Sequence, residues 1–160
     1  MASLAEELKM SRPFALREEE TTLAIIRTAD VLERRAADLL RPFNITPAQY
    51  NVLRILLGSP LGLACSQISE RLIAHDPDIT RLLDRMEVQH WIKRKRSATD
   101  RRVVLVFITT TGVELLERVK PLITAHHRQQ FADWDEKSLK QFLLMLARVR
   151  ETITQLKTGE

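Results

Sequence analysis

The chain contains few of the residues that build disulfide scaffolds, metal clusters or membrane spans. Its 160 residues include one cysteine, four glycines and six prolines. A single cysteine excludes an internal disulfide framework and a multi-cysteine zinc site, which is typical of a reducing compartment. No apolar run approaches the roughly 18 residues needed to cross a bilayer, and charges within residues 1–9 argue against a signal peptide. We therefore expect a cytoplasmic protein with short loops.

The positive charge of the sequence is concentrated in one short segment. The formal net charge is +4, which by itself favours an anionic partner only weakly. Residues 93–102 hold six basic residues and one acid, Asp100, so this segment carries +5 and the remaining residues sum to −1. Such a cluster indicates either interleaved acids or an anionic partner.

Apolar periodicity predicts helices before this basic segment. A short helical arm is expected within residues 1–9, and an amphipathic helix over residues 18–40. Thr46, Pro47 and Gln49 form a capping-box pattern that begins the next helix, which runs to about Leu57. The apolar stripe of the long helix consists of Ile25, Ala29, Leu32, Ala36 and Leu39.

Two shorter helices joined by a tight turn form a helix-turn-helix candidate. Ser66 is the expected cap of a helix that reaches about Ala74, with Ile73 among its inward residues. Asp76 as cap and Pro77 at the first position are expected to begin the following helix. Its buried stripe, at the spacing i, i+3, i+4 and i+7, consists of Ile79, Leu82, Leu83 and Met86.

The second of these helices then presents polar residues outward near its N-terminus. Arg81 points outward, and Thr80 and Arg85 flank it. Arginine can bond guanine in two places, threonine can touch a thymine methyl group, and a helix N-terminus favours phosphate. A solvated helix face is the alternative for this helix alone, and the neighbouring hairpin favours DNA.

The pattern changes to β-structure after residue 90. Residues 91–96 and 103–108 are rich in β-branched or basic residues and flank a turn, which predicts a β-hairpin with a basic tip. Asp100 is expected to pair with Arg102 and fix this tip, so that Arg96 or Arg101 can reach a narrow minor groove. The alternative is a flexible, solvated basic loop.

The C-terminal part is predicted to be helical. Thr109 is expected to cap a helix from residue 110 toward residue 131, bent at Pro121. The last helix is expected over residues 136–157, with an apolar seam at alternating spacings of 3 and 4 that needs a partner helix. The seam consists of Leu139, Phe142, Leu146, Val149, Ile153 and Leu156.

Four stretches of this sequence together resemble the multiple-antibiotic-resistance regulator (MarR) family. They are residues 80–87 (TRLLDRME), residues 91–94 (WIKR), the DRR tip at 100–102 and residues 108–112 (ITTTG). The resemblance extends from about Leu23 to Leu156. It implies a homodimer joined by its terminal helices, two winged-helix lobes on a pseudo-palindromic operator, and often release by a small ligand or oxidation.

One position departs from the family pattern. His90 stands where the family usually has a glycine between the recognition helix and the first wing strand. A left-handed backbone there would cost a non-glycine residue on the order of 1 kcal/mol. We therefore expect a slightly different or mildly strained turn within an unchanged fold.

Other reactive residues have simpler explanations. Cys65 lies beside a short strand expected at residues 63–65, and we interpret it as a small buried residue rather than an oxidant sensor. His126 and His127 are adjacent on a helix and point about 100° apart, so they do not easily share a metal. Trp91, Phe43, Phe131 and Trp134 could line a ligand pocket, but such aromatic residues more often belong to the core. Phosphate-loop and nucleophile-elbow motifs are absent.

Together these patterns predict a mainly α fold with a small β-wing, and no enzymatic activity, cofactor or metal. Residues 1–45 would form an arm and first dimerisation helix, residues 46–109 a winged helix-turn-helix lobe, and residues 110–160 the C-terminal dimerisation helices. The predicted function is sequence-specific regulation of transcription, with repression expected. The candidate DNA-binding residues are Ser66, Gln67, Asp78, Thr80, Arg81, Arg85, Arg94, Arg96, Arg101 and Arg102, and Asp100 and Arg102 shape the wing.

The expected partners follow from this function. They are double-stranded DNA in the nucleoid, a second copy of the chain and a small aromatic or amphipathic effector, with no membrane. The alternative is a winged helix that serves as a protein-interaction module without specific DNA readout. Salt dependence separates the two, because neutralising phosphates gives a steep loss of affinity with salt.

Overall fold

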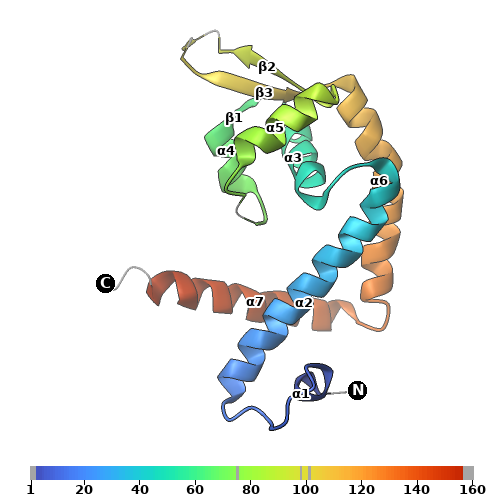
Figure 1. The fold of residues 1–160 in the computed structure, drawn as a ribbon, viewed down its shortest axis with the longest axis vertical. Coiled ribbons are helices and arrows are strands. Elements are labelled where there is room, and N and C mark those ends of the chain that lie inside the picture. The colour runs from blue at the N-terminus through green and yellow to red at the C-terminus, as the bar shows by residue number, and fades with distance from the viewer. Residues whose placement is uncertain (1–2, 75, 98, 101, 157–160) are drawn as a thin grey trace. The chain divides into compact units, whose positions relative to one another are not determined.

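The computed structural model describes residues 3–74, 76–97, 99–100 and 102–156 (Figure 1). The chain divides into two units, one ending at Ile123 and the other beginning at Thr124, and each is described by itself. No helix within the described residues is long and apolar enough to span a membrane. The first unit contains α1 (Leu4–Glu7), α2 (Arg17–Leu40), η1 (Arg41–Phe43), α3 (Pro47–Leu57), β1 (Leu63–Ala64), α4 (Cys65–Arg71), α5 (Ile79–Val88), β2 (Ile92–Arg96) and β3 (Val104–Ile108).

Two further helices follow in the described part of the chain. Helix α6 (Thr110–Gln130) begins in the first unit and ends in the second, which also contains α7 (Glu136–Leu156). The observed helices and the small sheet confirm the predicted fold class of a mainly α protein with a β-wing. The predicted boundary of the last helix at residue 157 lies outside the described residues.

Helix α3 begins as the sequence predicts. The Thr46 hydroxyl accepts a hydrogen bond from the Gln49 N–H at 3.3 Å, and the Gln49 side-chain oxygen accepts one from the Thr46 N–H at 2.9 Å. This reciprocal pair satisfies two backbone donors that the helix itself leaves unpaired. The predicted capping box is therefore confirmed.

The predicted start of α4 is wrong by two residues. The helix begins at Cys65 rather than after Ser66, because the Gln67 side chain accepts a hydrogen bond from the Ala64 N–H at 2.9 Å and fixes the start there. It also ends at Arg71, earlier than predicted. Ile73 consequently lies beyond the helix and is 84% exposed, not inward.

The predicted start of α5 is also wrong. Asp78, not Asp76, is the cap, and its Oδ1 accepts a hydrogen bond from the Arg81 N–H at 3.4 Å. The Asp76 carboxylate instead accepts from the Asp78 N–H at 2.9 Å, which closes a turn before the helix. Pro77 therefore lies in this turn, and the helix begins two residues later than predicted.

The three strands form one antiparallel sheet in the order β1-β3-β2. Leu63 pairs with Val106, and β2 pairs with β3 from Ile92 with Ile108 to Arg96 with Val104. This confirms the predicted hairpin, and we call residues 92–108 the wing. The wing projects beyond helices α3, α4 and α5 (Figure 1).

The core of the first unit lies between α3, α4, α5, α6 and the sheet. The predicted stripe of α5 is confirmed, since Leu82, Leu83 and Met86 are buried and Ile79 packs against them. Cys65 is half-buried against the same core. The largest fully buried side chains are Leu40, Leu53, Leu56, Ile68, Leu83, Met86, Ile92, Val52, Val106 and Val119.

The turn between α5 and β2 ends the helix with His90 in a left-handed conformation, at φ 57°. The His90 N–H donates to the Glu87 carbonyl at 2.9 Å, and the Trp91 N–H donates to the Met86 carbonyl at 3.1 Å. This pair of bonds defines a Schellman motif, in which glycine is the usual left-handed residue. The mild strain predicted at His90 therefore has a structural basis.

Helix α6 begins against this same turn. The Thr109 hydroxyl donates to the His90 carbonyl at 2.6 Å and accepts from the Gly112 N–H at 3.2 Å, so its predicted capping role is confirmed. A Cβ atom on Gly112 would lie 2.3 Å from the Trp91 carbonyl oxygen. Glycine at residue 112 therefore allows α6 to touch the backbone at the root of the wing.

The second unit contains the end of α6 and helix α7. The Asp135 carboxylate caps α7 by accepting a hydrogen bond from the Ser138 N–H at 2.7 Å. Trp134 makes edge contacts with Phe131 and Phe142, at ring-centroid distances of 5.7 and 5.4 Å. In this chain alone α7 has no buried residue among residues 136–156.

We predict that replacing His90 with glycine stabilises the protein. His90→Gly removes the left-handed penalty and should raise the free energy of unfolding by up to about 1 kcal/mol, reduced by the greater entropy of unfolded glycine. Gln89→Gly is the matched control, because Gln89 has an ordinary φ of −79° and glycine there should destabilise. Denaturant unfolding measures both, and an equal loss of stability in the two variants would contradict the strain.

Candidate nucleic-acid interface

The outward face of α5 carries exposed polar residues at its N-terminal end. Thr80, Arg81 and Arg85 are all exposed, as the sequence predicts. The Arg81 side chain is 82% exposed and lies 3.3 Å from the Asp78 carboxylate, which also caps the helix. The Arg85 Nε donates to the Arg81 carbonyl at 3.3 Å. Two guanidinium groups and a hydroxyl are therefore available on one face.

Helix α4 contributes the next two predicted residues. Ser66 and Gln67 are both exposed in its first turn. Gln67 already uses its side-chain oxygen to cap the helix, so only its amide NH₂ remains for an outside acceptor. Sequence reasoning predicted Gln67 as a contact residue and missed its capping role.

The tip of the wing is held by hydrogen bonds between residues close in sequence. The Asp100 Oδ1 accepts from the Arg102 backbone N–H at 3.0 Å and from its Nε at 3.3 Å, which confirms the predicted pairing. The Ser97 N–H donates to the Val103 carbonyl at 2.8 Å across the base of the tip. Arg102 keeps 91% of its side chain exposed. Arg101 lies outside the described residues.

The backbone hydrogen bond from Arg102, aided by its side chain, lowers the pKa of Asp100 below the usual 3.8. The folded protein therefore favours the ionised carboxylate. The contact that this charge makes is present above about pH 4 and is lost as the pH falls through the lowered pKa. The wing tip keeps its ion pair throughout the neutral range.

Strand β2 distributes its cations over two faces. Lys93 and Lys95 are exposed on one face, whereas Arg94 shares the opposite face with buried Ile92. Arg96 ends the strand and is exposed. The predicted basic hairpin is therefore not uniformly exposed, because the alternation of the strand turns Arg94 toward α5.

Arg94 makes ion pairs with two carboxylates of α5. Its Nη1 lies 2.6 Å from the Asp84 Oδ1 and 2.9 Å from the Glu87 Oε2, and its backbone N–H donates to the Glu87 Oε1 at 3.0 Å. Burial opposes the charge of Arg94, but the hydrogen bonds and charges of both carboxylates outweigh it and raise its pKa. We call Arg94, Asp84 and Glu87 the brace. Contact of Arg94 with DNA stays a prediction, and sequence reasoning missed this bridging role.

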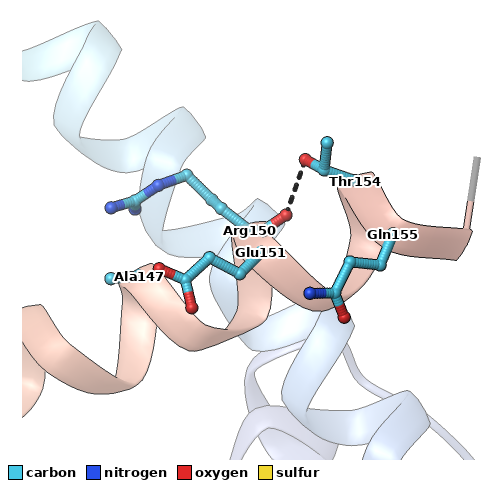
Figure 2. A pocket seen from close by; sticks show the side chains of 5 residues that line it. All are labelled: Ala147, Arg150, Glu151, Thr154 and Gln155. Carbon is cyan, nitrogen blue, oxygen red and sulfur yellow. Dashed lines mark hydrogen bonds between the residues drawn. The ribbon is translucent and has the colours of Figure 1, made fainter. Parts of the chain in front are cut away.

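A shallow hollow on α7 lies outside this surface. Figure 2 shows its lining side chains along a single helix, with the Thr154 hydroxyl bonded to the Arg150 carbonyl at 2.9 Å. The lining residues are Ala147, Arg150, Glu151, Thr154 and Gln155. One helix cannot enclose a ligand, so this hollow does not resemble an effector pocket. Within the described part of the chain, no three His, Cys, Asp or Glu residues gather as metal ligands would.

The arrangement of α3, α4 and α5 with a short strand and a two-stranded wing defines a winged-helix protein. The chain belongs to the MarR family, whose model matches residues 45–104. It is 33% identical over 101 residues to the organic hydroperoxide resistance transcriptional regulator of Bacillus subtilis. The match covers 63% of this chain and 68% of that protein.

Solved structures agree with this assignment. The MarR transcription factor of Planctomyces limnophilus is 33% identical, with a TM-score of 0.61, over 88% of this chain and 99% of that one. A mutant MarR from Escherichia coli, solved in complex with operator DNA, has a TM-score of 0.74 at 23% identity, over 86% and 99% of the two chains. Both structures share the overall fold of this chain.

The pKa of Asp100 is lowered both by the backbone N–H and by the side chain of Arg102, and one variant separates these two causes. Arg102→Ala removes the side-chain hydrogen bonds but keeps the backbone N–H, so the titration midpoint of Asp100 should rise and still remain below 3.8. Carboxyl-carbon NMR measures it. The pKa of Asp135, lowered by hydrogen bonds from Ser138, is the internal control and should not change. A parent midpoint at or above 3.8 would contradict the observed pairing.

Proposed function

We propose that this protein is a DNA-binding transcriptional repressor that binds a pseudo-palindromic operator as a homodimer. The observation that carries the proposal is the exposed Thr80, Arg81 and Arg85 face of α5 beside a basic wing whose tip is fixed by Asp100. Membership of the MarR family supports it. The proposal includes no catalytic step. Because the proposed ligand is operator DNA, we expect the protein to act on the chromosome in the cytoplasm.

The proposed binding mode assigns different tasks to the helix and the wing. Helix α5 enters the major groove, where an arginine can bond the O6 and N7 of guanine. The wing lies over the flanking minor groove, where Arg96, Arg101 and Arg102 meet negative potential. Ser66 and Gln67 on α4 lie near the phosphate backbone, and Asp78 orients Arg81. Two symmetry-related helices place half-site centres about 10 base pairs apart.

We predict that Arg81 and Arg85 determine sequence preference. Arg81→Ala or Arg85→Ala should lower operator affinity by about 1 to 3 kcal/mol per half-site and relax sequence selection, because the wrong base pairs are then no longer discriminated. Arg35→Ala, on exposed α2, is the matched control for loss of one arginine. Titrations of a selected genomic fragment at several salt concentrations measure these effects.

The same titrations distinguish DNA binding from a protein-interaction module. If each subunit neutralises three or four phosphates, log affinity should fall against log salt with a slope of roughly −5 to −7. A salt-independent interaction, or variants that bind DNA as well as the parent, would favour the protein-interaction alternative.

Dimerisation is proposed from the apolar surface of α7. Leu139, Phe142 and Leu146 of the predicted seam are half-buried, whereas Val149, Ile153 and Leu156 are 39%, 52% and 72% exposed. Leu143, Leu144 and Met145, outside the seam, are more than half exposed as well. A helix with apolar residues on several sides is stable in water only when other helices cover it. A second copy of the chain is the proposed cover.

We predict that charge on the seam dissociates the dimer. Val149→Asp/Ile153→Asp places two carboxylates in the apolar interface, so sedimentation equilibrium should shift from twice the chain mass toward the mass of one chain. Lys137→Asp changes the net charge by the same amount at an exposed position of the same helix and should remain dimeric. A parent that sediments as a stable, folded monomer would refute the dimer.

Release by a small aromatic or amphipathic effector stays a prediction of the family resemblance. Such a ligand would act by binding more tightly to the conformation that does not fit DNA. The hollow on α7 does not supply an apolar enclosure for it.

A further inference from the structure

We infer that Arg94 is a positioning residue that aligns helix α5, the proposed recognition helix, with the wing, and that it is not a phosphate contact. The inference rests on the proposed function, because alignment matters only if helix and wing bind one duplex together. Its basis is the brace, in which one guanidinium from β2 joins two carboxylates on successive turns of α5.

The hydrogen bonds of Arg94 are directed at one partner element. The side chain reaches Asp84 at 2.6 Å and Glu87 at 2.9 Å, and its Nη2 approaches the Thr80 carbonyl oxygen at 3.5 Å. The backbone N–H of the same residue also bonds Glu87. The contacts therefore extend over two turns of α5, which a single ion pair could not do.

Arg94 differs in exposure from the cations suited to contact DNA. Its side chain is 26% exposed, against 82% for Arg81 and 91% for Arg102. Most N–H donors of Arg81 and Arg102 are therefore bonded to water, and a DNA phosphate can take the place of that water. To reach a phosphate, Arg94 would have to leave Asp84 and Glu87, and both carboxylates would then lose their cation, which is unfavourable.

The brace lies farther along β2 than the turn that joins α5 to the wing. In that turn the chain is fixed by the hydrogen bond from the Trp91 N–H to the Met86 carbonyl and by the burial of Trp91 and Ile92. Apolar contacts resist separation but are weakly directional. The Arg94 Nη1 donates to both carboxylates and Nη2 faces the Thr80 carbonyl oxygen, and such hydrogen bonds are directional, so they fix the angle at which β2 leaves the helix.

This angle decides whether both grooves can be contacted together. Helix α5 and the wing tip are separate parts that must meet the major groove and the flanking minor groove of one duplex. A loose angle leaves the positive charge intact, so binding to random DNA should persist. The loss should appear in the ratio of operator affinity to random-sequence affinity.

The decisive variant removes the carboxylates and leaves Arg94 in place. Asp84→Asn/Glu87→Gln adds two units of positive charge beside the DNA face, so affinity for a random duplex should stay equal or rise. If the brace aligns the wing, the operator-to-random ratio should nevertheless fall about tenfold, within the range of coupling found for contacting residues. Glu114→Gln/Glu117→Gln on α6 makes the same charge change at exposed residues and should preserve the ratio.

A charge-conserving variant supplies the second test. Arg94→Lys keeps the cation, but its shorter side chain ends in a single nitrogen. It cannot replace both Nη1, which bonds the two carboxylates, and Nη2, which approaches the Thr80 carbonyl oxygen, so the ratio should again fall with an unchanged salt slope. Adding Arg94→Gln to Asp84→Asn/Glu87→Gln should lower the ratio little further, since the brace is already gone. If removing the carboxylates tightens operator and random DNA equally, Arg94 is a phosphate contact and the inference is wrong.

Hydrogen exchange of the free full-length protein tests the brace without DNA. The amides of β2, including the Arg94 N–H bonded to Glu87, should exchange about tenfold faster in Asp84→Asn/Glu87→Gln, while those of α3 keep their protection. Unchanged protection of β2 would overturn the inference. A parent that binds the selected operator no better than random DNA would instead refute the proposed function, and the exchange result would still decide whether Arg94 holds the wing.

Discussion

Burial of the inner face of α5 is the constraint on which the rest of this surface depends. Each of Leu82, Leu83 and Met86 contributes about 1.5 to 3 kcal/mol when removed from water. A partly exposed ion pair contributes a fraction of that. Apolar packing therefore decides which side of α5 faces solvent, and so exposes Arg81 and Arg85. Polar contacts then act on a smaller energy scale and set alignment.

The sequence predicted those features that local patterns determine. The capping box at Thr46, the stripe of α5 and the pairing of Asp100 with Arg102 all involve residues close in sequence. The predicted start of α5 was wrong because Asp76 and Asp78 are both suitable caps, and the predicted start of α4 was wrong because its cap position, Ala64, has no side-chain acceptor that would mark it. Local rules cannot choose between Asp76 and Asp78, whereas the tertiary packing of the following helix can.

The role of Arg94 could not be predicted from local patterns. Its partners on α5 are seven and ten residues away, across a turn whose geometry depends on His90. Strand alternation gave the only signal, because it places Arg94 on the same face as buried Ile92. Counting charge along the sequence treated all six cations alike and therefore overestimated how many are free to meet an anion.

The brace also affects how this protein could be redesigned. Recognition helices are attractive parts to exchange between relatives when a new operator preference is wanted. Here the outward side of that helix carries Asp84 and Glu87, which belong functionally to the neighbouring strand. A transplanted helix without both acids would leave a guanidinium unmatched at the junction. The smallest transferable part is therefore the helix together with the first strand of the wing.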